Sequence, residues 1–142
     1  MKRTRFTLCL AGFLMLAFLA IPVLAINGRD FAGTYSTSNV SQSGDNYMLT
    51  FSAKVFNYSG EDVSNATISL KDSVLPGQTY AVFQGVSISS NHSATVSSSV
   101  TIPAREYQGW KQGSPPHLVV QFVDLSGNNR MENVELTQGV AQ

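Results

Sequence analysis

Reactive and metal-binding residues are scarce in this chain of 142 residues, which has one cysteine, Cys9, and two histidines, His92 and His117. Cys9 lies in an N-terminal apolar stretch that we expect to be removed. Its loss would exclude disulfide-stapled folds, thiol catalysis and cysteine-based zinc sites. Two histidines fall short of the three protein ligands that a catalytic zinc ion usually has. The sequence therefore predicts neither a metal site nor a cofactor.

Charged residues are also few, at 13% of the chain. Three of the nine basic residues fall within residues 1–5, so the remainder has six basic and nine acidic residues and a net charge of −3. No cluster of lysine and arginine is present after residue 25. Nucleic-acid-binding proteins need such a basic surface to contact phosphates, so we expect no nucleic acid partner.

The N-terminus has the order of a signal peptide. Residues 1–5 are basic, residues 6–25 are apolar, and Pro22 precedes the segment Val23-Leu24-Ala25. Small residues after a helix-breaking proline suit a signal peptidase, so we expect residues 1–25 to be removed by cleavage before Ile26. The alternative is an uncleaved anchor, because about 20 apolar residues can span a bilayer. In either case the rest of the chain is exported, to the periplasm or to the medium.

After residue 25, alternation of apolar and polar residues with a period of two dominates the sequence. In residues 92–102, Ala94, Val96, Val100 and Ile102 share one face, interrupted by Ser98, while Ser and Thr occupy the other. Such alternation is typical of strands with one buried face. Seven strands are expected, over or near residues 31–40, 47–55, 66–70, 79–88, 92–102, 118–123 and 134–136. Gly85 is expected to mark a bulge in the fourth strand.

Turn residues separate these strands at short, regular intervals, as in Ser43-Gly44-Asp45-Asn46 and Ser126-Gly127-Asn128-Asn129. No stretch after residue 25 has a sustained helical period. Seven short strands in residues 26–142 predict a single all-β domain, an immunoglobulin-like antiparallel β-sandwich. A small closed barrel is the alternative, because counting strands does not separate the two.

Two turn motifs carry a resemblance. Residues 55–63 run Val-Phe-Asn-Tyr-Ser-Gly-Glu-Asp-Val and lead into the alternating residues 66–70, and a late turn begins at Asp124. These segments resemble bacterial immunoglobulin-like β-sandwich modules of the CARDB-like and FxLYD-like kinds. The resemblance implies a fold and not a function. The cysteine–tryptophan core of antibody domains is absent.

The segment Pro103–Pro116 is the one long interruption of the strand rhythm, and it contains the only tryptophan, Trp110. Long loops with aromatic and charged side chains often bind ligands. A ligand site is therefore expected at Tyr107, Trp110, Arg105 and Lys111. The alternative is that Tyr107 and Trp110, three residues apart, form one turn of helix that caps the core.

Other motifs are weaker. Asp124-Leu125-Ser126-Gly127-Asn128-Asn129 has oxygen ligands suited to calcium, but Glu132 is not at the position of an EF-hand ligand, and a hairpin turn explains the segment. No Gly-x-Ser-x-Gly motif and no evident carboxylate pair is present. We therefore expect a protein that is not an enzyme, with no catalytic residues.

These observations predict an exported, non-catalytic binding or structural module. The expected partner is another extracytoplasmic protein or cell-envelope component. The alternative is a carbohydrate-binding module in which Tyr107 and Trp110 stack on a glycan. A membrane is a partner only if the signal sequence stays uncleaved.

Overall fold

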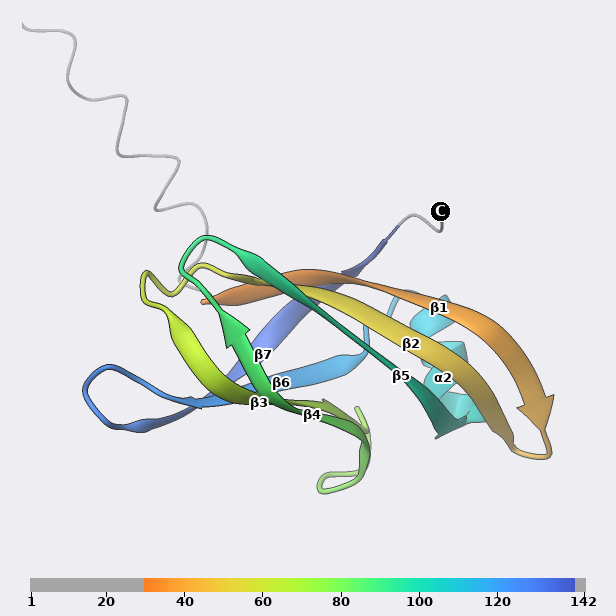
Figure 1. The fold of residues 1–142 in the computed structure, drawn as a ribbon. Helices are drawn as coiled ribbons and strands as arrows, with labels where there is room; N and C mark the ends of the chain where they lie inside the picture. Colours follow the sequence, from red (N-terminus) through yellow and green to blue (C-terminus); the bar gives the residue numbers. More distant parts are fainter. Residues whose placement is uncertain (1–29, 140–142) are drawn as a thin grey trace, which may run out of the picture.

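A computed structural model describes residues 30–139 of the chain. The leader predicted for residues 1–25 and its cleavage point lie outside the described residues. Figure 1 shows the elements, which are β1 (Phe31–Ser43), β2 (Asn46–Asn57), β3 (Val63–Lys71), β4 (Thr79–Ile88), β5 (Ser93–Pro103), α2 (Ala104–Lys111), β6 (His117–Val123) and β7 (Asn129–Gln138). The all-β prediction and all seven expected strands are confirmed, although β7 begins five residues earlier than its alternation indicated.

The strands follow the order β4-β3-β6-β7-β1-β2-β5. Every pairing is antiparallel except that of β1 with β7, which is parallel from Ala32–Glu135 to Tyr35–Gln138. The sheet is therefore mixed, and the expectation of a purely antiparallel sandwich is corrected in this respect. The parallel pair joins a layer made of β1, β2 and β5 to a layer made of β3, β4, β6 and β7.

The inner faces of both layers form one core. Phe31 and Tyr35 of β1 point inward with Phe51 of β2, and Leu118 and Val120 of β6 meet them from the other layer. The inward row expected in β5 is also observed, with Val96, Val100 and Ile102 buried. The period of two in the sequence therefore reports correctly which residues are buried.

Close approach of β1 to β2 depends on glycine at position 33. A Cβ atom built there would lie 2.3 Å from the carbonyl oxygen of Lys54. Real contacts of this kind do not occur at that distance, so any larger residue would push the two strands apart.

The pairing of β3 with β4 is interrupted by register shifts, two of which lie close together. The register moves from Ala66–Val86 to Ile68–Phe83, which leaves an extra residue beside Gly85, where φ is 68°. This confirms the predicted bulge. A second bulge separates the pair Val63–Ile88 from Ala66–Val86 and places Asn65 at a φ of 54°. Asparagine is one of the few residues that tolerate this left-handed conformation.

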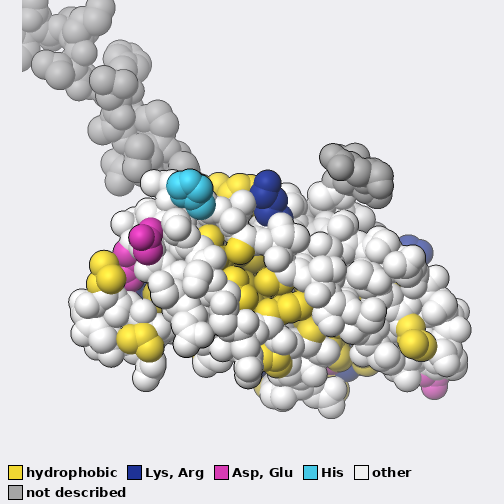
Figure 2. All heavy atoms as spheres, viewed as in Figure 1, with side chains coloured by type: hydrophobic (Ala, Val, Ile, Leu, Met, Phe, Trp, Pro, Cys, Tyr) yellow, Lys and Arg dark blue, Asp and Glu magenta, His cyan; other side chains and the backbone are white. Residues whose placement is uncertain are grey.

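The sheet is left open between its two edge strands. A short turn joins β4 to β5, and the two strands lie near each other, yet no backbone pairing connects them among the described residues. We call this gap the seam. Ala81, Phe83 and Val86 of β4 and Ala94 of β5 are only partly buried against the core. Figure 2 shows apolar side chains along the middle of this face, between β4 and β5 as they lie in Figure 1.

Candidate binding surfaces and the buried polar network

Helix α2 closes one end of the sandwich. Trp110 is 2% exposed and packs against Tyr35 and Phe51, with ring centroids 6.3 and 5.9 Å away. Tyr107 packs against Tyr47 at 4.6 Å. The helix therefore caps the core, as the structural alternative for this segment expected. It is longer than the single turn expected, because it continues from Ala104 to Lys111.

A polar network fastens this helix to the loop between β3 and β4. The Glu106 carboxylate, which is buried, accepts hydrogen bonds from Trp110 Nε1 at 3.1 Å and from Ser73 Oγ at 2.8 Å. Asp72, also buried, accepts from Arg105 Nη2 at 2.7 Å and from the Tyr80 hydroxyl.

Backbone donors complete the shell of Asp72, because its Oδ1 also accepts from the amides of Val74 and Leu75, both at 2.7 Å. The hydrogen bond from Arg105 holds the pKa of Asp72 well below its usual range, and the bonds from Tyr80 and the two amides act in the same direction. Burial, together with the bond to Asp72, raises the pKa of the Tyr80 hydroxyl. This carboxylate is therefore locked in its charged form as a structural acceptor.

The four residues of the expected ligand site are divided by this arrangement. Trp110 is inside the core, and Tyr107 is half-buried with Lys111 Nζ 5.7 Å from its ring centroid. Arg105 is exposed but paired with Asp72, and Lys111 is exposed. The structure thus leaves no face of Trp110 on which a sugar ring could stack, while it leaves Lys111 at the surface.

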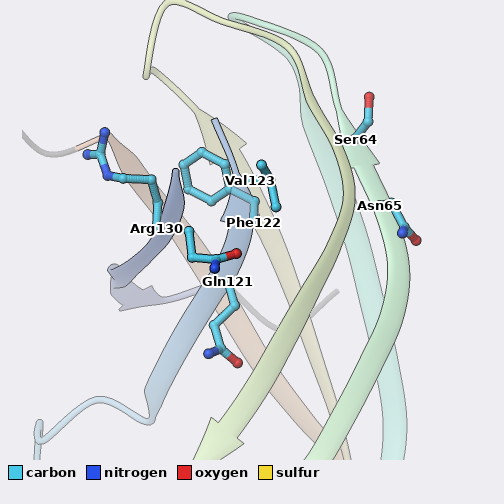
Figure 3. Close-up of a pocket in the computed structure, with 7 residues that line it drawn as sticks. Ser64, Asn65, Gln121, Phe122, Val123 and Arg130 are labelled. Carbon is cyan, nitrogen blue, oxygen red and sulfur yellow. The ribbon is translucent and has the colours of Figure 1, made fainter. Parts of the chain in front are cut away.

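A hollow of about 570 Å³ lies near the opposite end, where β3 and β6 separate. Their pairing stops at Thr67–Gln121, and beyond it the bulge at Asn65 takes β3 toward β4 while β6 continues beside β7. In Figure 3, Phe122 and Val123 lie between Arg130 on one side and Ser64 and Asn65 on the other, and the side chain of Asn65 points away from Phe122.

One exposed apolar side chain, Val123, lines this hollow, and two more belong to the adjoining turn and strand. Val123 of β6 is 58% exposed, Met131 of β7 is 61% exposed, and Leu125 in the connecting turn is 80% exposed. We call these three residues the apolar rim. Val123 and Met131 stand at outward positions, where the alternation of their strands calls for polar residues. That mismatch is the signal in the sequence that could have revealed them, and our sequence analysis missed it.

Arg130 lines the same hollow as Val123 and lies in a group of partly buried carboxylates. Its guanidinium contacts Glu132 at 2.6 Å, Asp30 at 3.6 Å and Asp124 at 3.7 Å. Backbone hydrogen bonds, first among them that from Asn128, lower the pKa of Asp124. The same Asp124 carboxylate accepts from the amides of Ser126 and Asn128, both at 2.9 Å. Asp124 thus organises its own turn, in agreement with the hairpin interpretation rather than with a calcium loop.

The outer face of the other layer has a different chemistry. Rows of hydroxyls lie in register across the three strands, as in Ser36–Ser52–Ser97 and Ser38–Thr50–Ser99. Lys54, Phe56 and Tyr58 follow at one end of this face, and the rings of Phe56 and Tyr58 are parallel within 9° at 6.1 Å. Tyr58 is 45% exposed, so this pair offers a small aromatic surface beside hydroxyl groups.

Among the described residues, the histidines do not group with acidic side chains into a metal site. His92 Nδ1 lies 2.9 Å from the carbonyl oxygen of Ser90, and His117 Nε2 lies 3.0 Å from Asn133 Oδ1. Within residues 30–139, no three His, Cys, Asp or Glu side chains are grouped so that they could hold a metal ion. In the same part of the chain, no helix has the length and apolar character needed to cross a bilayer.

Comparison with known proteins gives only distant structural similarity. No family model matches the chain. No curated protein matches it. Among solved structures, it is similar to part of a GH20 exo-β-N-acetylglucosaminidase from Vibrio harveyi, with 16% identity and a TM-score of 0.46 over 80% of this chain and 19% of the enzyme.

It is also similar to a CARDB domain from Pyrococcus furiosus, the kind of module that its turn motifs resemble. The identity is 9% and the TM-score 0.34, over 76% of this chain and 94% of that domain. A structural-genomics target shares 13% identity with a TM-score of 0.41, over 75% of this chain and 82% of that one. Similarities at this level carry no conclusion about function.

Proposed function

We propose that this protein is an exported, non-catalytic module that binds another extracytoplasmic protein through the apolar rim. The observation that carries the proposal is the exposure of Val123, Leu125 and Met131 on β6, β7 and the turn between them, next to a hollow that Val123 lines. Contiguous exposed apolar groups bordered by polar residues are typical of protein interaction sites. Arg130, which lines the same hollow as Val123, would orient a partner together with its carboxylates.

The buried polar network supports the non-catalytic part of this proposal. The Asp72 and Glu106 side chains are inaccessible to a substrate, and their oxygens accept hydrogen bonds from the protein itself. A general acid or base must reach the reacting atom. Neither carboxylate does so in this conformation.

Site-specific photo-crosslinking in the native host tests the function. A photoreactive phenylalanine analogue at Val123 should give an adduct of one defined mass, whereas the same analogue at Ser38, an exposed residue on the opposite layer, should give none. Met131→Asp should abolish the adduct while leaving the unfolding midpoint unchanged. Adducts of equal yield from both positions, or none from Val123, would contradict the proposal. Mass analysis of the purified protein checks cleavage before Ile26.

A glycan is the second candidate ligand, and the parallel rings of Phe56 and Tyr58 favour it. Aromatic faces beside hydroxyls suit sugar rings. When the protein is tested for binding to a panel of immobilised polysaccharides, Tyr58→Ala should abolish its retention on the polysaccharide that binds the unmodified protein. Lys111→Ala, near the originally expected site at Tyr107, should do so instead if the glycan binds beside α2. Retention that survives both changes, or no retention by the unmodified protein, would exclude this candidate.

A further inference from the structure

The edge strand β5 lies in a long stretch without charge. Residues 73–104 contain no Asp, Glu, Lys or Arg, although the whole chain has eighteen such residues. Both edges of the sheet, β4 and β5, fall within this stretch. Edge strands present unpaired backbone groups, and proteins usually protect them with charged residues, prolines or bulges. Here neither edge has a charged side chain.

The two edges differ in regularity. β4 contains the bulge at Gly85 and a second register shift between the pairs Leu70–Ala81 and Lys71–Thr79, and both distort its backbone. β5 pairs with β2 without a register shift from Asn46–Pro103 to Phe56–Ser93, and its only proline is its last residue. β5 is therefore the more regular of the two edges and the one better suited to accept another strand.

The neutrality of β5 indicates what kind of strand it accepts. When an edge strand pairs antiparallel with its own copy, each side chain near the two-fold axis meets a side chain of the same strand. A charged residue there would face a like charge, which destabilises the pair. A different partner protein can be oriented by opposite charges across the interface. An uncharged edge can pair with its own copy without repulsion, and it offers no charge that would orient a different partner.

We propose that two copies of the chain associate through antiparallel pairing of β5 with β5 across a two-fold axis at Ser98, the middle residue of the strand. This interface lies on a different surface from the apolar rim and goes beyond the proposed function. On the inner side, Val96 would lie opposite Val100 of the second copy. On the outer side, Thr95 would lie opposite Thr101 and Ser97 opposite Ser99 of the second copy. Valine pairs and threonine pairs are favourable in such cross-strand positions.

The proposed two-fold axis also explains why a serine lies at position 98. It interrupts an inward row that is otherwise apolar, and it is only half-buried, with its hydroxyl donating to the carbonyl oxygen of Ser99 at 3.2 Å. At the axis it would meet Ser98 of the second copy, where two small side chains leave room for the strands to approach. The pairing would join the hydroxyl rows of both copies into one continuous face and would cover part of the seam.

Charged residues introduced at Ser97 and Ser99 test this arrangement, because both positions are exposed and their replacement leaves the core intact. The chain is expressed at full length with its own leader, and its mass is followed by sedimentation equilibrium over a range of concentrations. The unmodified protein should be dimeric. The double variant S97K/S99K, which places lysine opposite lysine twice, should raise the dimer dissociation constant at least roughly tenfold.

The double variant S97K/S99E supplies the matched control, since it puts lysine opposite glutamate at both positions and should restore the dimer. S38K, in the same hydroxyl row but on the internal strand β1, should leave the dimer unchanged. A monomeric unmodified protein at all concentrations would overturn the proposal. So would a dimer that survives S97K/S99K, or one that S97K/S99E fails to restore. Loss of the dimer with an intact crosslink at Val123 would leave the proposed function standing.

Discussion

Each end of the sandwich carries an arginine among carboxylates, but the two ends use them differently. At the helix end, the side chains of Asp72 and Glu106 are fully buried and accept hydrogen bonds from side chains and backbone. At the turn end, Arg130 and its partners Asp30, Asp124 and Glu132 stay in contact with solvent. The first group joins α2 to the loop between β3 and β4, and the second lies at the hollow that Val123 lines. Residue type alone therefore does not identify a functional site; burial and hydrogen-bond saturation do.

The strongest way to break the helix end is to remove its aromatic anchor. Trp110→Ala deletes a buried ring and the donor to Glu106, and should lower the free energy of unfolding by roughly 3–5 kcal/mol. Urea denaturation followed by circular dichroism measures this. Trp110→Phe keeps an aromatic ring but loses the Nε1 donor, so its free energy of unfolding should lie between those of Trp110→Ala and the unmodified protein. Equal stability of Trp110→Ala and the unmodified protein would show that α2 does not cap the core.

Removal of the Asp72 charge should have a smaller and pH-dependent effect. The pKa of Asp72 is lowered on folding, so its stabilisation is complete above about pH 4 and is lost as the pH falls toward the folded-state pKa. Asp72→Asn should cost roughly 1–3 kcal/mol at pH 7, because solvent around the exposed Arg105 replaces part of the lost pairing.

The gap between the unfolding free energies of Asp72→Asn and the unmodified protein should narrow between pH 4 and pH 2. Asp45→Asn, which changes an exposed carboxylate in the turn between β1 and β2, serves as the matched control. A gap that stays constant over this range would contradict the role given to Asp72.

At the turn end, the effect on stability should be the smallest. Arg130→Gln removes ion pairs that water already screens, so the urea midpoint should not move measurably at 0.15 M salt. The same change should weaken the crosslink from Val123 if Arg130 orients the partner. A large loss of stability would mean that the two ends are alike after all.

The sequence predicted the parts of this structure that depend on local patterns. Alternation located all seven strands, and Gly85 located a bulge, because both effects act within a few residues. The parallel pairing of β1 with β7 could not be predicted, since it joins residues about a hundred positions apart. Helix α2 was underestimated because its N-cap is Pro103, whose side chain makes no capping hydrogen bond.

The candidate sites were predicted less well for a related reason. Arg105 looked available for a ligand because the sequence does not show that it pairs with Asp72, which lies 33 residues earlier. Trp110 looked like a ligand-binding residue and a core residue at once, and only packing against Tyr35 and Phe51 separates these roles. The apolar rim needed strand directions as well as residue types, since Val123 and Met131 matter because they point outward.

The parallel pair of β1 and β7 has a consequence for how the chain folds. The first strand is held on one side by β2, its neighbour in sequence, and on the other by the last strand. Closing so long a loop is entropically unfavourable and tends to slow folding. The backbone pairing between the two layers cannot form until β7 has been synthesised, so folding along the chain reaches this pairing last among the described strands.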